Sequence, residues 1–212
     1  SVLFVCLHRP DRSPSQRFRF EQYLGFLKEN GYEIKFSYLL NAKDDKRFYS
    51  RGNYFSKFII LWKSFWKRTW EVFFSPKHDI VFVQRECFML GTSFFERKFA
   101  RRSRLIFDFD DSIWLQNVSE ANRKLGFLKN PGKTSQIIKV SNLVIAGNEY
   151  LADYAKKYNA NVVIIPTTIN TDQYSIKQVT DSNKIIIGWS GSFSTIQHFE
   201  FALDALKLIK AK

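Results

Sequence analysis

The sequence predicts an α/β protein with a doubly wound parallel sheet. Seven short apolar runs recur along its 212 residues. Most are continuous in Val, Ile, Leu and Phe, as is typical of strands covered on both faces. Helical segments lie between them, which favours parallel strands joined by crossover helices. A hydrophobic fraction of 45% is enough for a sizeable core.

The expected elements follow one another in a regular order. The first helix follows the first strand: Ser13 can cap it, Pro14 takes the first helical position, Gln16 completes a capping box and Gly31 follows its end. Asn148 is the natural cap of the helix after the fifth strand. The expected strands are 2–7, 33–39, 79–84, 104–109, 142–147, 161–166 and 184–190.

These elements predict an unequal division of the chain. Residues 1–166 suffice for one Rossmann-like domain, and the polar segment 167–183, which has no clear period, is expected to be a linker. Residues 184–212 would form only the first strand, turn and helix of a second, incomplete domain.

Composition narrows the classes of partner. A net charge of +13 predicts attraction to nucleic acid, an anionic membrane surface or a phosphate-bearing small molecule. No nucleic-acid-binding motif accompanies the charge, so we expect no nucleic-acid partner. Cys6 and Cys87 lack the spacing of a zinc site or a disulfide scaffold and favour buried thiols in a reducing cytoplasm. No signal peptide and no membrane span is expected.

The turn after the first strand is rich in arginine. Arg9, Arg12, Arg17 and Arg19 crowd the start of a helix, where acidic residues are usual, and Ser15 lies among them. A phosphate or carboxylate ligand would resolve this conflict. The alternative is a solvated basic surface. The turn lacks the GxGxxG pattern, which disfavours a dinucleotide-dependent dehydrogenase.

Three acids close the fourth strand. Asp108, Asp110 and Asp111 stand where ligands bind in doubly wound sheets, beyond the carboxyl ends of the strands. They could accept a proton from a hydroxyl, hold a sugar hydroxyl or bind a metal ion, although no partner carboxylates for a metal are evident. The alternative is a turn in which Asp111 caps the next helix.

Residues 54–74 predict a helix with an aromatic stripe and a polar side that includes Lys57, Ser64 and Arg68. Such a stripe usually packs into the core. Alternatively it lies in a membrane interface, with Trp62, Trp66 and Trp70 facing the lipid. The stripe consists of Phe55, Phe58, Ile59, Trp62, Trp66, Trp70 and Phe73.

The turn at 188–195 has a composition that suits phosphate binding. Glycine allows close approach of a backbone, and hydroxyl groups stand near the start of the next helix. The turn lacks the lysine of a Walker A motif, and alone it is a weak signal.

Together these segments resemble family 4 of the nucleotide-sugar glycosyltransferases. The segments that carry the resemblance are "SPSQRFRFEQYLGFLKENGYEI", "HDIVFVQRE", "RLIFDFDDSIW", "SNLVIAGNEYLADYAKKYNANVVIIPTTINTDQY" and "IIIGWSGSFSTIQHFEFALDAL". Members of this family are retaining, metal-independent enzymes with two facing Rossmann-like domains, the GT-B fold. The resemblance spans nearly the whole chain, which would hold the acceptor domain and the start of the donor domain.

The resemblance implies roles for particular residues. Asp110 and Asp111 would lie near the sugar-accepting hydroxyl as catalytic groups. Gly191, Ser192 and Thr195 would reach the donor phosphates. The acceptor or another anion would contact Arg12, Ser15, Arg17, Arg19 and Asn148.

The resemblance also implies the reaction and its partners. The donor would be a nucleoside-diphosphate sugar, used as a co-substrate without metal or cofactor, and the acceptor a glycan, a lipid-linked molecule or another anion. The paired glutamates of the family's donor domain lie beyond the residues seen here, so we expect this chain alone not to transfer sugar. We expect a cytoplasmic protein at the inner face of the membrane. The alternative is a non-catalytic module that binds membrane surfaces or polyanions.

Overall fold

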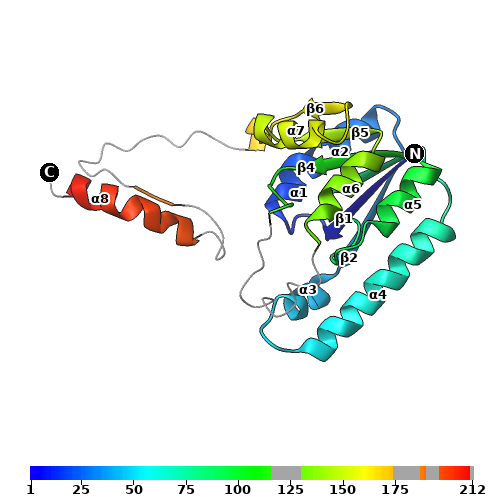
Figure 1. Ribbon diagram of the computed structural model, residues 1–212, viewed down its shortest axis with the longest axis horizontal. Helices are drawn as coiled ribbons and strands as arrows, with labels where there is room; N and C mark the ends of the chain where they lie inside the picture. The colour runs from blue at the N-terminus through cyan, green and yellow to red at the C-terminus, as the bar shows by residue number, and fades with distance from the viewer. Residues whose placement is uncertain (116–129, 174–186, 190–195, 211–212) are drawn as a thin grey trace. The chain divides into compact units, whose positions relative to one another are not determined.

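The computed structural model describes residues 1–115, 130–173, 187–189 and 196–210. The chain divides into two units, 1–170 and 171–212 (Figure 1). The first unit is a six-stranded, entirely parallel sheet in the order β2-β1-β3-β4-β5-β6. Helices cover both faces, so the predicted doubly wound, Rossmann-like α/β fold is confirmed.

The first six strands lie close to their expected positions. β6 is three residues long and shorter than expected. In the seventh expected strand, the described residues 187–189 have no strand structure. The strands are β1 Val2–His8, β2 Ile34–Leu40, β3 Ile80–Gln84, β4 Arg104–Phe109, β5 Leu143–Ala146 and β6 Val162–Ile164.

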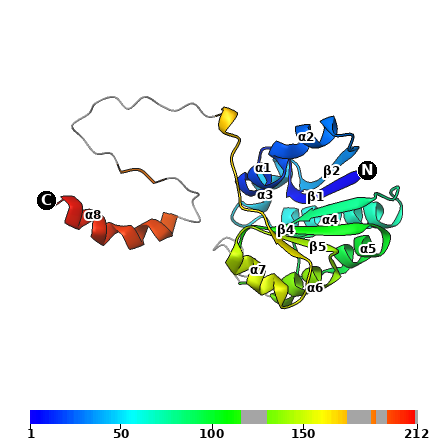
Figure 2. The same ribbon diagram turned by 90° about the horizontal axis from the view of Figure 1, so that it is seen from above.

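The helices of the first unit form two layers. Figure 2 shows α1 and α2 on one side of the sheet and α5, α6 and α7 on the other. The helical elements are α1 Pro14–Arg19, η1 Glu21–Tyr23, α2 Leu24–Glu29, α3 Ala42–Phe48, α4 Tyr54–Phe73, α5 Phe94–Arg102, α6 Gly132–Val140 and α7 Glu149–Lys156.

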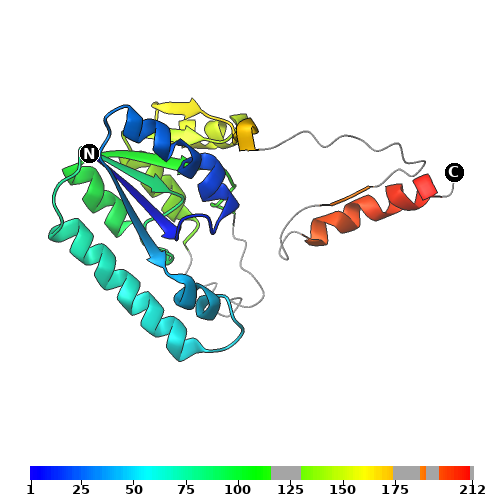
Figure 3. The same cartoon turned by 180° about the vertical axis from the view of Figure 1, so that it is seen from behind.

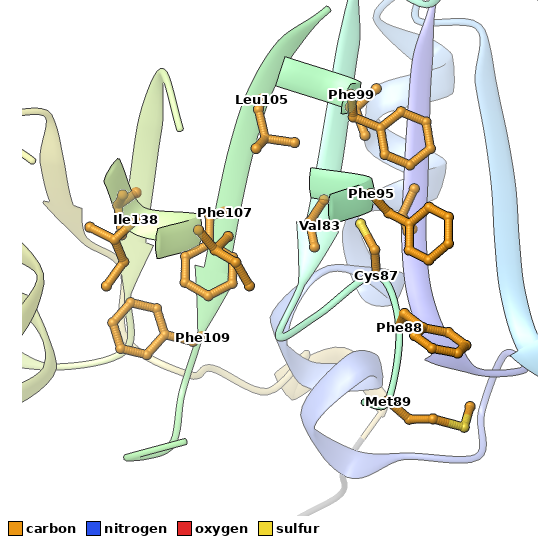
Figure 4. Packing of buried hydrophobic residues seen from close by; sticks show 14 of the residues in the cluster. Val83, Cys87, Phe88, Met89, Phe95, Phe99, Leu105, Phe107, Phe109 and Ile138 are labelled. Atoms are coloured by element: carbon orange, nitrogen blue, oxygen red, sulfur yellow. The ribbon is translucent and has the colours of Figure 1, made fainter. Parts of the chain in front are cut away.

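Alternate side chains of β1, β2 and β3 enter two separate cores. Phe4 on β1 packs with Phe20 beneath α1 and α2. The larger core lies on the other face, where Val83 of β3 lies toward Phe95 of α5 and Phe107 of β4 lies beside Ile138 of α6 (Figure 4). This period-two distribution is what parallel strands between two helical layers require.

The helical segment after β1 is interrupted and is not capped as expected. Ser13 makes no capping hydrogen bond through its side chain, and the helix breaks at Phe20. Gln16 does not complete the box, because its amide bonds both backbone groups of His8 at 2.9 Å. The expected end is confirmed: Gly31 has φ +82° and closes α2 in a Schellman motif.

The largest departure from expectation is the side of α4 that faces the sheet. The helix forms where it was expected, but the interpretation of its aromatic stripe as core is wrong. Trp62, Trp66 and Trp70 are 55%, 51% and 63% exposed. Lys57 and Arg68, expected on the outer side, are buried.

Arg68 explains this orientation. Its guanidinium donates to the backbone oxygens of Cys6 (2.8 Å) and Cys87 (2.7 Å) and to the side chains of Ser37 and Glu71 (2.6 Å each). A buried charge with this number of acceptors fixes the polar side of the helix against the sheet. The aromatic stripe is therefore left on the outside.

The second unit contains η3 Thr171–Gln173, η4 Ile196–Ala202 and α8 Leu203–Lys210. A helix was expected in this segment, and α8 supplies it. Across the described residues, no helix has the length and apolarity needed to cross a membrane.

Candidate functional site

The strand order marks one edge of the sheet as the place where a ligand would bind. The chain runs from β1 outward to β2 and then returns to β3 on the other side of β1. This reversal is the topological switch point, where doubly wound sheets bind ligands beyond the carboxyl ends of the strands. Five of the expected site residues follow strands at this edge: Arg12, Ser15, Asp110, Asp111 and Asn148.

Two arginines after β1 share one buried carboxylate. Arg9 Nη1 and Arg12 Nε donate to the same oxygen of Asp45 at 3.1 and 2.5 Å. Their side chains remain 35% and 43% exposed, whereas that of Asp45 is 6% exposed. Within this cluster two guanidinium groups therefore share one carboxylate, and both remain partly exposed to solvent.

Asp45 reaches this place because α3 begins directly after β2. Asn41 caps the helix by accepting hydrogen bonds from the backbone of Lys43 and Asp44. Acidic residues are favourable in the first turn of a helix. Burial alone would raise the pKa of Asp45, but hydrogen bonds from Arg12 and Arg9 outweigh it and lower that pKa. Asp45 is therefore a fixed negative group.

His8 closes β1 beside this cluster. Its Nδ1 lies 3.8 Å from Oδ1 of Asp45, and its Nε2 lies 3.4 Å from the hydroxyl of Tyr49. Burial lowers the pKa of His8 to about 4, helped by the charges of Arg12 and Arg85 and opposed by Asp45. The imidazole is neutral at pH 7 and can donate or accept a hydrogen bond.

Arg85 connects β3 to the acids after β4. Arg85 follows β3 directly and adopts φ +65°. Its backbone N–H donates to the backbone oxygen of Asp108 at 2.9 Å. Its Nη1 lies 3.0 Å from Oδ2 of Asp111. A left-handed backbone is costly for arginine, and such strain is concentrated at functional sites. Asp11, in the turn after β1, has φ 60° as well.

Arg19 and Asp108 form an internal ion pair. Both side chains are 1% exposed; Arg19 Nε donates to the two oxygens of Asp108 at 3.1 and 3.2 Å, and Nη1 donates to the backbone oxygen of Ile165. Burial raises the pKa of Asp108 to about 6, although Arg19 opposes the shift. The pair joins α1 to β4 and to the segment after β6, so it supports the edge.

Asp110 lies in a restricted space at the end of β4. Its Oδ1 is buried without a hydrogen-bond partner in the described part of the chain. A side chain in place of Gly147, after β5, would put its Cβ 3.2 Å from the Cα of Asp110. Such a carboxylate oxygen can accept a hydrogen bond from a ligand hydroxyl.

The remaining predicted residues have simpler surroundings. Ser15 accepts a hydrogen bond from Gln84 at 2.8 Å. Asn148 caps α7 by accepting from the backbone of Leu151, as expected. Arg17 is exposed, with its guanidinium 4.9 Å from the ring centroid of Phe18.

Two groups of predicted site residues are not among those found at the carboxyl edge of the sheet. Trp62, Trp66 and Trp70 lie on the exposed side of α4. Gly191, Ser192 and Thr195 lie outside the described residues. Within the described ranges, no cluster of three His, Cys, Asp or Glu side chains could hold a metal ion.

Sequence reasoning gave no role to Asp45, Tyr49 or Arg85. Arg85 could have been found, because it follows the end of β3 just as Asp110 follows the end of β4. Asp45 and Tyr49 carried a weaker signal, since they belong to a short helix and the residue after it.

A shallow hollow of 590 Å³ lies at the opposite edge of the sheet, beside the amino ends of β3 and β4. Ligands of parallel sheets bind at the carboxyl ends, so we place the candidate site there and not in this hollow. No protein-family model matches the chain, and no curated protein matches it significantly.

Proposed function

We propose that the first unit is the acceptor-binding half of a retaining glycosyltransferase that uses a nucleoside-diphosphate sugar. Its acceptor would be a glycan or lipid-linked molecule that carries a phosphate or another anionic group. The buried thiols of Cys6 and Cys87 fit a reducing compartment, so we place the reaction on the cytoplasmic side.

The observation that carries the proposal is the pair of guanidinium groups at the switch point, both bound to the one carboxylate of Asp45. Arg9 and Arg12 are held by Asp45 and still partly exposed. Guanidinium groups suit phosphate because they donate two parallel hydrogen bonds. Since Asp45 orients both side chains before a ligand arrives, less conformational entropy is lost on binding.

The nearby acids fit the second requirement of the reaction. An acceptor hydroxyl must be held close to the sugar donor, and positioning of this kind supplies much of the rate enhancement. The carboxylate of Asp110, which directly follows β4, is the candidate acceptor of a hydrogen bond from that hydroxyl, although its Oδ1 is buried in this structure. Asp111 holds Arg85, which adds a further guanidinium at this edge.

Binding of a phosphate-bearing sugar tests the anion site. We expect a hexose phosphate to bind in isothermal titration calorimetry and the uncharged hexose to bind more weakly. Replacement Arg12→Gln should weaken hexose phosphate binding about tenfold through loss of a charge-assisted hydrogen bond. Arg97→Gln removes the same charge at an exposed position of α5, away from the switch point, and should leave the affinity for hexose phosphate unchanged. Equal binding of both sugars, or equal loss in both variants, would contradict the site.

Sugar transfer is tested on the protein purified from its source. Nucleoside-diphosphate hexoses are offered with phosphate-bearing acceptors, and mass spectrometry detects an added hexose. Asp110→Asn should lower the transfer rate by about a hundredfold if the carboxylate assists the hydroxyl. Transfer that is unchanged in this variant would remove Asp110 from the reaction, and the absence of any hexose addition would reject the proposed activity.

A further inference from the structure

The exposed side of α4 is an interaction surface that the proposed reaction does not use. We propose that it binds the surface of a lipid bilayer that carries anionic headgroups. The inference does not rest on the proposed function. The aromatic face is defined by its exposed members Phe55, Phe58, Ile59, Trp62, Phe65, Trp66, Trp70, Phe73 and Phe74.

The aromatic face runs along α4 as two successive groups of contacting rings. Successive rings meet at helical spacing: Phe58 and Trp62 have centroids 6.5 Å apart, and Trp62 and Trp66 have centroids 5.6 Å apart. Trp70 and Phe74 continue the row at 4.9 Å. Contiguous apolar surfaces of this kind on a folded protein mark places where something binds.

The helix is amphipathic in the opposite sense to an ordinary surface helix. Three of its five buried residues are polar or charged, Lys57, Ser64 and Arg68, beside the aliphatic Ile60 and Val72, whereas its outer side is largely aromatic. In water the usual arrangement places the apolar side inward. The hydrogen bonds of Arg68 to Cys6 and Cys87 hold the helix in this orientation, so the aromatic face is built into the fold.

The charges on α4 favour an anionic partner. Lys63 and Lys67 are exposed at the margin of the aromatic face, where Lys63 Nζ lies 3.3 Å from Oδ2 of Asp44 and Lys67 donates to the backbone oxygen of Tyr38. The single acid of the helix, Glu71, is turned inward, where it accepts from Ser37 at 2.5 Å and from Arg68 at 2.6 Å. No exposed carboxylate of α4 would therefore repel an anionic surface.

Basic residues also flank both ends of the aromatic face. In Figure 3, α3 lies beside the amino-terminal part of α4. The acids of α3 are buried, while its lysines and the nearby arginines are exposed. At the other end, Lys98 lies 5.3 Å from the ring centroid of Phe73. The exposed bases that neighbour these ends in the sequence are Lys43, Lys46, Arg47 and Arg51 before α4 and Lys77 after it.

A bilayer surface fits this combination better than a second copy of the chain. A twofold dimer through the aromatic face would bring Lys63 and Lys67 toward the same lysines of its partner. At a membrane, tryptophan lies at the level of the headgroups, and lysine attracts anionic lipid.

Vesicle co-sedimentation of the whole chain tests the proposal. We expect binding to vesicles of phosphatidylcholine with phosphatidylglycerol, weaker binding to phosphatidylcholine alone, and a loss of binding as salt rises. Trp62→Ala/Trp66→Ala/Trp70→Ala should weaken binding at least about tenfold. The control Phe26→Ala/Tyr32→Ala/Tyr150→Ala removes exposed rings from α2, the turn after it and α7 and should bind as the unchanged chain does.

Charge is tested separately with matched variants. Lys63→Glu/Lys67→Glu should reduce binding to the anionic vesicles about tenfold. Lys28→Glu/Lys156→Glu changes the net charge equally at exposed sites on α2 and α7 and should have a much smaller effect. Tryptophan emission should shift to the blue on binding in the unchanged chain and not in the triple tryptophan variant. Circular dichroism checks that every variant is folded.

Three results would overturn the proposal. The first is no binding to either vesicle. The second is binding that the tryptophan replacements leave unchanged. The third is a dimer, measured by light scattering, that the same replacements dissociate, since a second copy of the chain would then cover the aromatic face.

Discussion

At the scale of single residues, His8 combines the features of the candidate site. It ends β1 at the switch point, stacks on Tyr49 with ring centroids 5.9 Å apart, and lies beside Asp45. A neighbouring carboxylate favours the charged imidazole, but burial and the nearby arginines have the larger effect. The folded protein therefore resists protonation of His8.

The pH dependence of stability follows from this shift. The pKa of His8 falls from 6.5 to about 4 on folding, so between these values the unfolded chain binds more protons than the folded chain. The contribution of His8 is fully present above pH 6.5 and is lost as the pH falls toward 4. When the pH is lowered from 6.5 to 4, the free energy of unfolding should fall by about 2 kcal/mol less in His8→Gln than in the unchanged chain. Urea denaturation at a series of pH values measures this difference.

Nuclear magnetic resonance provides an independent measurement of the same group. The imidazole C–H resonance of His8 should titrate near pH 4 in the folded protein. A midpoint near 6.5 would contradict the predicted effect of burial. The pH dependence of His8→Gln would then match that of the unchanged chain.

Expectations for single residues failed where a side chain forms its hydrogen bonds with a group distant in the sequence and not with its neighbours along the chain. Ser13 and Gln16 have the spacing of a capping box, but the amide of Gln16 bonds His8 across the turn. Arg19 was expected at the surface and lies buried on Asp108, which is 89 positions away. The acids after β4 were located correctly because strand ends are predictable from an apolar run that stops.

At the scale of elements, α4 shows what a hydrophobic period can and cannot predict. The period located the helix to within one residue of its observed end at Phe73. It could not show which side faces the sheet, because the polar side holds Arg68 and the sheet offers that residue backbone acceptors. The continuous apolar strands carried no such ambiguity, since both of their faces are covered.

Replacement of Arg68 tests this account of α4. Arg68→Leu should lower the free energy of unfolding by about 3–5 kcal/mol, because Glu71 and two backbone oxygens lose their donor in the interior. Lys63→Leu, on the exposed side of the same helix, should change it by less than about 1 kcal/mol. Urea denaturation measures both. Similar losses in the two variants would mean that Arg68 does not anchor the helix.

At the scale of the whole molecule, the sequence predicted the layers but not the strand order. Continuous apolar strands separated by helices indicate a parallel sheet, and crossovers limit how such strands are connected. Which strand neighbours which depends on contacts across the sheet, and β1 has β2 and β3 as its neighbours. The switch point, and with it the meeting of Arg9, Arg12 and Asp45, became visible only in the structure.

The two units differ in how much core they contain. Every buried residue of the two described cores lies between Val2 and Ala155. In the second unit, the described part of α8 leaves Leu208 and Ile209 72% and 59% exposed. The first unit thus contains the apolar burial that drives cooperative folding.

A chain of residues 1–170 should therefore unfold cooperatively with a thermal midpoint within about 4 °C of that of the whole chain. A chain of residues 1–140 provides the comparison. It lacks β5 and α7 and with them Val144, Ala146, Leu151 and Ala155, so it should show no cooperative transition. Differential scanning calorimetry measures all three. If residues 1–170 failed to unfold cooperatively while the whole chain did, residues 171–212 would have to supply part of the core, and the division into units would not describe how the protein folds.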